Sequence, residues 1–255
     1  MAANLLNESS IATTSENERY RHALLNLRAA RRAVDLCAYD SAQKFAVRGI
    51  ALQPQDDSSK KWDDDHYEVT MELYSIAAEA ECCTGRSEVL EQHFQEVATT
   101  ARHDKPVLDK IRVYTASMTD IANQDRAVEA RDLCIDLLRQ LGCKFPKKSL
   151  PIVLSSIVGL VQIKSRAKKI TKEDVLGLPM MKDRKQIEIM RLLDKLATFC
   201  YITTSKLFPL VILRSFKLTL QYGLSEFSPS CFGIVGLMLA GAFRDFQGAN
   251  VYAMW

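Results

Sequence analysis

The segment spanning residues 66–146 constrains the fold of this chain more than any other. Within it, residues 67–82 show an apolar pattern with helical spacing, and at about 100° per residue the apolar side chains fall into two separate stripes. The stripes consist of Val69, Leu73, Ile76 and Ala80, and of Tyr67, Met71, Tyr74 and Ala78. A helix that is apolar over so wide an arc needs a neighbour on each side. The pattern therefore predicts a stacked array of helices.

Residues 18–146 are predicted to form three antiparallel helical hairpins. We expect their turns at residues 39–41, 83–86 and 123–125, with Gly85 as a left-handed C-cap and Ser87 as the next N-cap. Pro54, Pro106 and Pro146 close successive units, so hairpins recur about every 40–50 residues, a period typical of tetratricopeptide-like repeats. The predicted fold is an all-α, right-handed solenoid of such hairpins.

The two ends of the chain are predicted to be less regular. Residues 1–17 have the Ser, Thr and Asn content of a flexible lead-in, and residues 53–65 form a polar linker in which Trp62 is expected to lie against the next helix. Residues 147–255 are predicted to continue as an irregular helical block, with helices over 150–169, 183–202, 205–222 and 228–243. A final helix from residue 246 ends in Tyr252 and Trp255. Because a terminal solenoid helix normally has a polar outer face, we expect the chain to be part of something longer.

Composition supports the all-α prediction and an intracellular protein. The β-branched residues do not gather in alternating runs, which argues against strands. Seven cysteines, an odd number, indicate reduced thiols, and no secretory signal precedes residue 18. Residues 151–163 and 231–243 are too short to span a membrane, and residues 196–213 carry Lys206 and Pro209. We therefore expect a cytoplasmic protein without a membrane span.

Charge is distributed unevenly along the chain. Residues 1–140 contain 17 Lys or Arg and 24 Asp or Glu, whereas residues 141–255 contain 17 and 7. The densest basic cluster comprises Lys164, Arg166, Lys168, Lys169 and Lys172. It follows a predicted helix, where cations stabilise the C-terminus, so a solvated helix end is the favoured interpretation and a docking patch for an acidic partner the alternative. Without interleaved aromatic residues, no nucleic-acid partner is expected.

No catalytic or metal-binding pattern is present in the sequence. There is no phosphate loop and no GxGxxG motif, and Gly233, Gly236 and Gly241 lie in an apolar helix where close packing explains them. The four histidines have no metal-ligand spacing. The adjacent Cys82 and Cys83 could be redox-active, although a buried thiol beside a partly exposed one is the favoured interpretation. We predict a chain that is not an enzyme and that binds no cofactor or metal.

Several segments together resemble one family. In order, they are LCAYDSA at residues 36–42, AAEAECCTG at 77–85, LGCKFP at 141–146, LGLPMM at 176–181, KLFP at 206–209 and YG at 222–223. These segments are similar to the tetratricopeptide-like helical region that follows the AAA-type ATPase module in large signalling proteins. Those proteins join a serine/threonine kinase-like domain, the ATPase, this region, a GAF domain and a sensor histidine kinase. The resemblance implies a non-catalytic segment whose partners are flanking domains.

Two functions remain open from the sequence. The first is a helical-repeat module that couples flanking domains in signal transduction, with the acidic strip of Glu68, Glu72 and Glu79 as its partner surface. The alternative is a stand-alone peptide-binding adaptor. Its candidate binding residues are Tyr67, Tyr74, Lys110, Arg112 and Tyr114.

Overall fold

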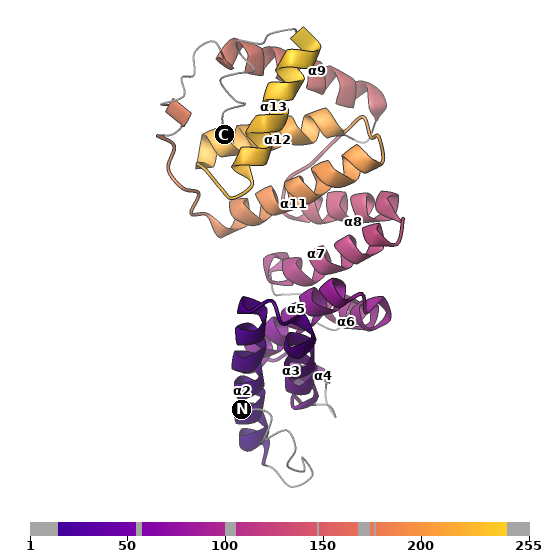
Figure 1. The fold of residues 1–255 in the computed structure, drawn as a ribbon, viewed down its shortest axis with the longest axis vertical. Coiled ribbons are helices and arrows are strands. Elements are labelled where there is room, and N and C mark those ends of the chain that lie inside the picture. The colour runs from indigo at the N-terminus through magenta and orange to yellow at the C-terminus, as the bar shows by residue number, and fades with distance from the viewer. Residues whose placement is uncertain are drawn as a thin grey trace. The chain divides into compact units, whose positions relative to one another are not determined.

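The computed structural model describes residues 15–54, 58–99, 106–146, 148–167, 174–175 and 177–243, which form helices joined by short connections (Figure 1). The predicted all-α fold is confirmed. Within the described ranges, an isolated bridge between Met180 and Leu224 is the sole β pairing. No helix in these ranges combines the length and apolar character needed to cross a bilayer. The right-handed sense of the array stays a prediction.

The chain divides into two compact units, Met1–Asn123 and Gln124–Trp255. The boundary falls in the turn of the third predicted hairpin and not after Pro146, where we expected the regular array to end. The two helices of that hairpin, α7 (Val107–Asn123) and α8 (Ala127–Gln140), consequently belong to different units. The expected lead-in before Ser15 and the final helix from residue 246 lie outside the described residues.

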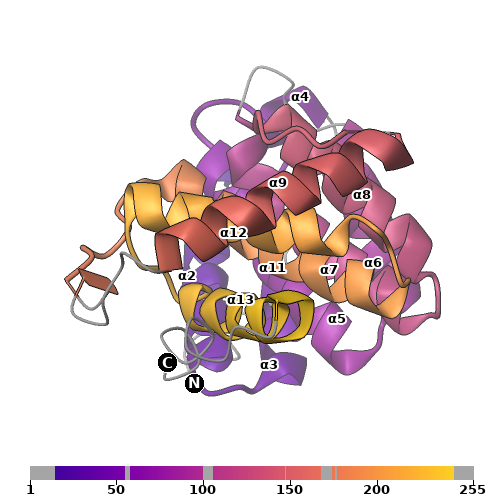
Figure 2. The same cartoon turned by 90° about the horizontal axis from the view of Figure 1, so that it is seen from above.

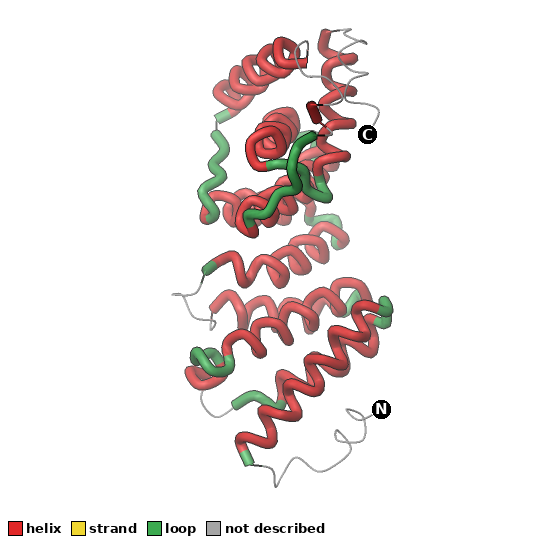
Figure 3. Tube along the Cα trace, turned by 90° about the vertical axis from the view of Figure 1, so that its left-hand side faces the viewer, coloured by secondary structure: helices red, strands yellow, loops and turns green. Residues whose placement is uncertain are grey.

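The first unit is built around one central helix, α5 (Tyr67–Thr84). It packs against α2 (Glu16–Asp35), α3 (Tyr39–Ala51), α6 (Ser87–Thr99) and α7. A short helix, α4 (Ser58–Lys61), lies in the predicted polar linker, and the adjoining Trp62 is buried as expected. Figure 3 traces the chain as a tube, with the helices in red and the connections between them in green. Contacts with four helices explain why α5 is apolar on two sides, as its sequence pattern predicts.

Local signals set the ends of the helices in this unit. Gly85 has φ 70° and caps α5, which confirms the predicted left-handed position. Ser15 caps α2 in a capping box with Glu18, so α2 starts two residues before the predicted position. The predicted turn at residues 39–41 is wrong, because Cys37, with φ 54°, makes the turn and α3 begins at Tyr39. Ser87 is the first residue of α6, and its hydroxyl donates to Asp120 and not to its own helix.

The second unit is centred on α12 (Phe208–Tyr222). It packs against α11 (Arg184–Ile202), α13 (Ser228–Phe243) and α9 (Ser149–Ala167), while α11 also covers α8. Asp183 caps α11 by accepting from the backbone of Lys185 and Gln186, and Pro209 lies in the first turn of α12, as the sequence predicts. Figure 2 shows α9 running alongside α12, its main neighbour.

A tight backbone crossing joins the segment before α11 to the end of α12. Leu224 donates its N–H to the carbonyl oxygen of Pro179 at 2.8 Å, and Met181 donates to Leu224 at 2.7 Å. Gly223 has φ 102°, and a Cβ there would collide with that carbonyl oxygen. The crossing therefore requires glycine at this position.

Candidate partner-binding groove

The tyrosines predicted to face a peptide are part of the core of the first unit. Tyr67 and Tyr74 are buried, and their rings lie 6.2 Å and 5.4 Å from the ring of Trp62. Tyr114 is half-buried with its ring 5.0 Å from that of Phe94, edge to face. Lys110 is also buried, and burial lowers its pKa. These four residues do not form an exposed binding face, which corrects that part of the sequence-based interpretation.

The predicted acidic strip is largely neutralised within the unit. Arg112 donates to both oxygens of Glu79 at 2.7 Å and 2.8 Å, and to Glu72 at 2.9 Å. Burial alone would lower the pKa of Arg112, but the hydrogen bonds and charges of Glu79 and Glu72 raise it instead. Arg31 also donates to Glu72. Glu68 alone of the three predicted carboxylates remains exposed, so the strip is mainly an intramolecular ion-pair surface between α5 and α7.

A partly buried ion pair that the sequence does not reveal lies beside Trp62. The ammonium group of Lys61, which is buried, donates to Glu96 at 2.6 Å and to the hydroxyl of Tyr74 at 2.7 Å. Burial raises the pKa of Glu96, but hydrogen bonds from Lys61 and Tyr74 outweigh this and lower it. Burial and the hydrogen bond to Glu96 raise the pKa of Tyr74. The linker is thus held against α5 and α6.

A second polar chain connects α3, α5 and α6. Glu81 is 0% exposed, and its carboxylate lies 2.9 Å from Nδ1 of His93. Gln43 donates to Glu81 at 3.4 Å and accepts from Arg86 at 2.6 Å, and Arg86 also pairs with Asp40. These contacts join α3, α5 and α6 and give the buried carboxylate of Glu81 its hydrogen-bond partners.

The thiols and acidic groups do not assemble into a reactive centre in the described part of the chain. No group of three or more His, Cys, Asp or Glu side chains there could hold a metal ion. All seven cysteines are free, and Cys83 is exposed beside a half-buried Cys82. Burial raises the pKa of Cys200 to about 11 and that of Cys231 to about 12, so both stay protonated and weakly nucleophilic at neutral pH.

In the described part of the second unit, a long run of exposed apolar side chains lies on α9. Six side chains, from 39% to 70% exposed, follow the spacing i, i+3, i+4, i+7, i+8 and i+11. They are Leu150, Val153, Leu154, Ile157, Val158 and Val161, here called the α9 stripe. At about 100° per residue these positions cover an arc of about 140°. An apolar face of this width is typical of the side of a helix that packs against a protein core.

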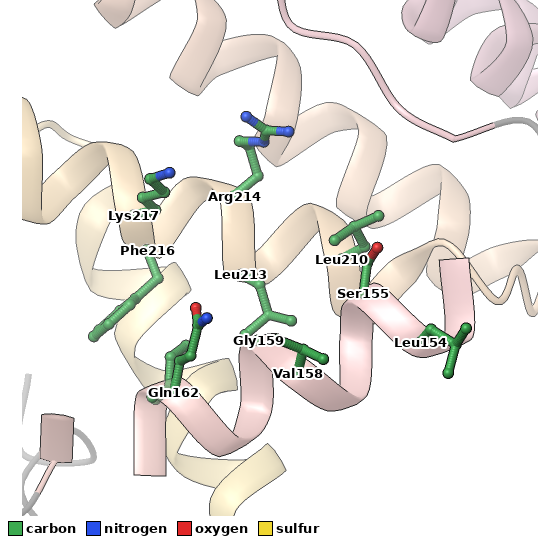
Figure 4. Close-up of a pocket in the computed structure, with 11 residues that line it drawn as sticks. Leu154, Ser155, Val158, Gly159, Gln162, Leu210, Leu213, Arg214, Phe216 and Lys217 are labelled. Atoms are coloured by element: carbon green, nitrogen blue, oxygen red, sulfur yellow. The ribbon is translucent and has the colours of Figure 1, made fainter. Parts of the chain in front are cut away.

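The opposite side of α9 packs closely against α12. Ser156 and Ile163 are buried, and a Cβ on Gly159 would meet the side chain of Leu213. This approach leaves a groove of about 470 Å³ between the two helices. Figure 4 shows Leu154 and Val158 of α9 lying near Leu210 and Leu213 of α12. Leu154 and Val158 belong to both the groove and the α9 stripe, so the two form one continuous apolar surface.

Cations border this groove on the α12 side. Arg214 and Lys217 line it, and in Figure 4 their charged ends point away from α9. Arg214 donates to the carbonyl oxygen of Lys144 at 3.4 Å, and its guanidinium lies 6.0 Å from the centre of the Phe145 ring. Lys217 is exposed. The groove therefore combines mainly apolar walls, which also include Ser155 and Gln162, with a positively charged rim on the α12 side.

Sequence reasoning located α9 but not its exposed side. The sequence predicts a helix that is apolar first and basic later, over residues 150–169, and the structure has it at Ser149–Ala167. Because α9 is apolar along most of its length, its sequence suggests complete burial. Its few polar residues do not indicate which side of the helix α12 covers. The α9 stripe is therefore a feature that only the tertiary structure reveals.

Comparison with protein-family models, curated proteins and solved structures finds no match to the chain.

Proposed function

We propose that this chain is a non-catalytic helical interaction module that binds a helix of a partner protein in the groove between α9 and α12. The observation that carries the proposal is the α9 stripe, an apolar strip three turns long on the surface of a folded unit. Contiguous exposed apolar surface of this kind is typical of interaction sites. Its spacing is that of one apolar face of a helix, the kind of face that packs against a second helix.

The shape of the surface supports a helix as the bound element. Leu154 and Val158 form one wall of the groove and Leu210 and Leu213 the other. Ridges of side chains on a third helix can insert between two such walls at an interaxial distance of about 8–10 Å. A helix bound there would cover Leu154 and Val158, the part of the α9 stripe that lines the groove.

The family resemblance supports a narrower form of the same proposal. If the helical segments follow an ATPase and precede a histidine kinase, as in the signalling proteins that they resemble, the partner helix belongs to a flanking domain and the module couples the two. The odd number of cysteines supports a cytoplasmic location as part of this proposal. Stable binding of a purified flanking domain at the groove would support this form specifically.

A selection from displayed amphipathic helical peptides tests the proposal. The library would keep apolar residues at i, i+3, i+4 and i+7 and randomise all other positions among Glu, Lys, Gln and Ala. We expect the wild-type chain to enrich peptides with dissociation constants of about 1–100 μM. The enriched peptides should lose binding to Val158→Glu, which places a charge in the apolar wall at a position already 54% exposed.

The matched control is Val128→Glu on α8. Val128 is 53% exposed and does not line the groove, so it reproduces the change in size and charge elsewhere in the same unit. Peptides that bind this variant and the wild-type chain but not Val158→Glu identify the groove as the site. A selection that yields no peptide distinguishing these variants would sink the proposal.

A further inference from the structure

We infer that the helix recognised by the α9–α12 groove is acidic, with Asp or Glu residues along the borders of its apolar face. This inference rests on the proposed function and adds the chemistry of the partner. It follows from the charges around the groove, from their distribution along α9 and from the shape of the apolar surface.

The two helices that form the groove carry cations and no carboxylates. Neither Ser149–Ala167 nor Phe208–Tyr222 contains an Asp or Glu. In sequence, nine Lys or Arg and no Asp or Glu occur from Leu137 to Lys172. A partner helix lying in the groove would therefore meet Arg214 and Lys217 on the rim without a competing negative charge from either wall. Complementary charge of this kind governs partner choice and the rate of association more than affinity.

Arg214 is positioned to bind a carboxylate. Its guanidinium is oriented by the carbonyl oxygen of Lys144 and by the Phe145 ring. These contacts leave other N–H groups of the guanidinium for an incoming acceptor, since each guanidinium has five donors. An Arg with restricted rotamers loses less conformational entropy on binding, and it can pair with a carboxylate in a bidentate geometry.

The distribution of charge along α9 argues against a second copy of this chain as the occupant. Lys144 and Lys148 precede the helix, and Lys164 lies in its last turn. If two copies paired through the α9 stripe, a parallel arrangement would place Lys148 near Lys148 of the other copy, and Lys164 near its Lys164. An antiparallel arrangement would place Lys148 near Lys164 of the other copy. Both arrangements bring like charges together, which disfavours self-association.

The shape and composition of the surface argue against a lipid bilayer as the occupant. Leu154 and Val158 face a groove of about 470 Å³, whereas a bilayer surface is complementary to a convex helix. Helices that lie in a membrane interface use Trp, Phe or Leu on the apolar face and basic residues on the opposite face. The α9 stripe includes Leu150 and Leu154 but no aromatic residue, and the opposite face of α9 packs on α12 instead of exposing basic residues.

The test compares two peptides with the same apolar core, taken from a sequence enriched in the selection above. One carries Glu at every flanking position and the other carries Lys. We expect the full chain to bind the Glu peptide at least about tenfold more tightly than the Lys peptide in 50 mM salt, with the difference shrinking in 500 mM salt. Lys217→Glu should weaken binding of the Glu peptide about three- to tenfold, whereas Lys182→Glu, an exposed cation that does not line the groove, should leave it unchanged.

Each contrary outcome has a distinct meaning. Equal binding of the two peptides, both lost in Val158→Glu, would overturn the acidic partner and leave the proposed function in place. Failure of both peptides to bind would overturn both. Binding of the chain to vesicles of phosphatidylserine and phosphatidylcholine that depends on Val158, without peptide binding, would replace the acidic helix with a lipid surface. A dimer in sedimentation that Val158→Glu dissociates would replace it with a second copy.

Discussion

Two helices of this protein, α5 and α9, are apolar on more than one side, yet only one of them is covered on both. α5 contacts α2, α3, α6 and α7, and its buried residues include Leu73, Tyr74 and Ile76. α9 has α12 as its main neighbour, and its six outward apolar side chains remain at least 39% exposed. The comparison shows that helical periodicity reveals how many sides need a neighbour but not whether the unit itself supplies one.

The charged groups on α5 and those beside α9 also differ in exposure. On α5, Glu72, Glu79 and Glu81 each accept hydrogen bonds from side chains of other helices. At the groove beside α9, Lys217 is exposed. Within the first unit, therefore, most apolar and charged groups of the central helix contribute to internal stability, and Glu68 stays exposed. In the second unit, both kinds of group remain accessible around α9.

The largest expected effect separates the covered helix from the exposed one. Leu73→Ala removes a fully buried side chain of α5, so it should lower the free energy of unfolding of the first unit by about 2–5 kcal/mol. Leu154→Ala on the α9 stripe, 55% exposed, should cost the second unit less than about 1 kcal/mol. Native-state hydrogen exchange, resolved by unit, measures both values. Equal costs would show that the two helices are covered alike.

The next effect concerns the ion pairs that join α5 to α7. Arg112→Met leaves Glu72 and Glu79 partly buried without their main partner and should destabilise the first unit by about 1–3 kcal/mol. The exposed pair between Arg86 and Asp40, in the same unit, provides the control, and Asp40→Asn should cost less than about 1 kcal/mol. Urea unfolding followed by Trp62 fluorescence, in a Trp255→Phe background, reports on the first unit. A cost for Arg112→Met no larger than that of the control contradicts this role.

A smaller effect is expected from pH at the Lys61–Glu96 pair. The pKa of Glu96 is lowered from 4.5 in the folded state, so its contribution to stability is present above pH 4.5 and is lost as the pH falls through the folded-state pKa. Glu96→Gln should cost about 1 kcal/mol at pH 7 and weaken the dependence of stability on pH below 4.5. Denaturant midpoints at pH 7, 5, 4 and 3 measure this. Parallel pH curves for the variant and the wild-type protein would contradict the prediction.

The smallest expected effect is that of a substitution on the exposed side of α9, and the buried side of the same helix serves as its reference. Val158→Ser on the α9 stripe should change the free energy of unfolding by less than about 0.5 kcal/mol, because the side chain is already half exposed. Ile163→Ser on the side facing α12 should cost about 2–4 kcal/mol because the position is buried. Exchange protection of α9 and α12 reports both variants. A substantial loss of protection with Val158→Ser would mean that the stripe is needed for folding and is not free for a partner.

The candidate site could be predicted only in part. The sequence places a helix near residues 150–169 and identifies the basic character of the segment that follows. The sequence instead predicts Tyr67, Tyr74 and Arg112 as candidate binding residues. The two-sided apolar pattern of α5 does not specify whether each side packs against the core or against a partner. Burial of Tyr74 and pairing of Arg112 with Glu79 depend on residues more than ten positions away.

What the sequence alone determined are the features set by nearest neighbours along the chain. The all-α class follows from a 3.6-residue periodicity, and the helix ends at Gly85, Asp183 and Pro209 follow from backbone and capping chemistry within one turn. These signals act over a few residues, so they can be recognised in the sequence without knowledge of the tertiary structure.

Only the tertiary structure decided which apolar sides are covered and which charges are paired. Lys61 contacts Glu96, and Gln43 contacts Arg86, although the residues of each pair are 35 and 43 positions apart in the sequence. The exposure of the α9 stripe and the boundary after Asn123 likewise depend on which helices pack together. The physical reason is that burial and charge pairing belong to contacts between elements, and periodicity within one element does not specify its neighbours.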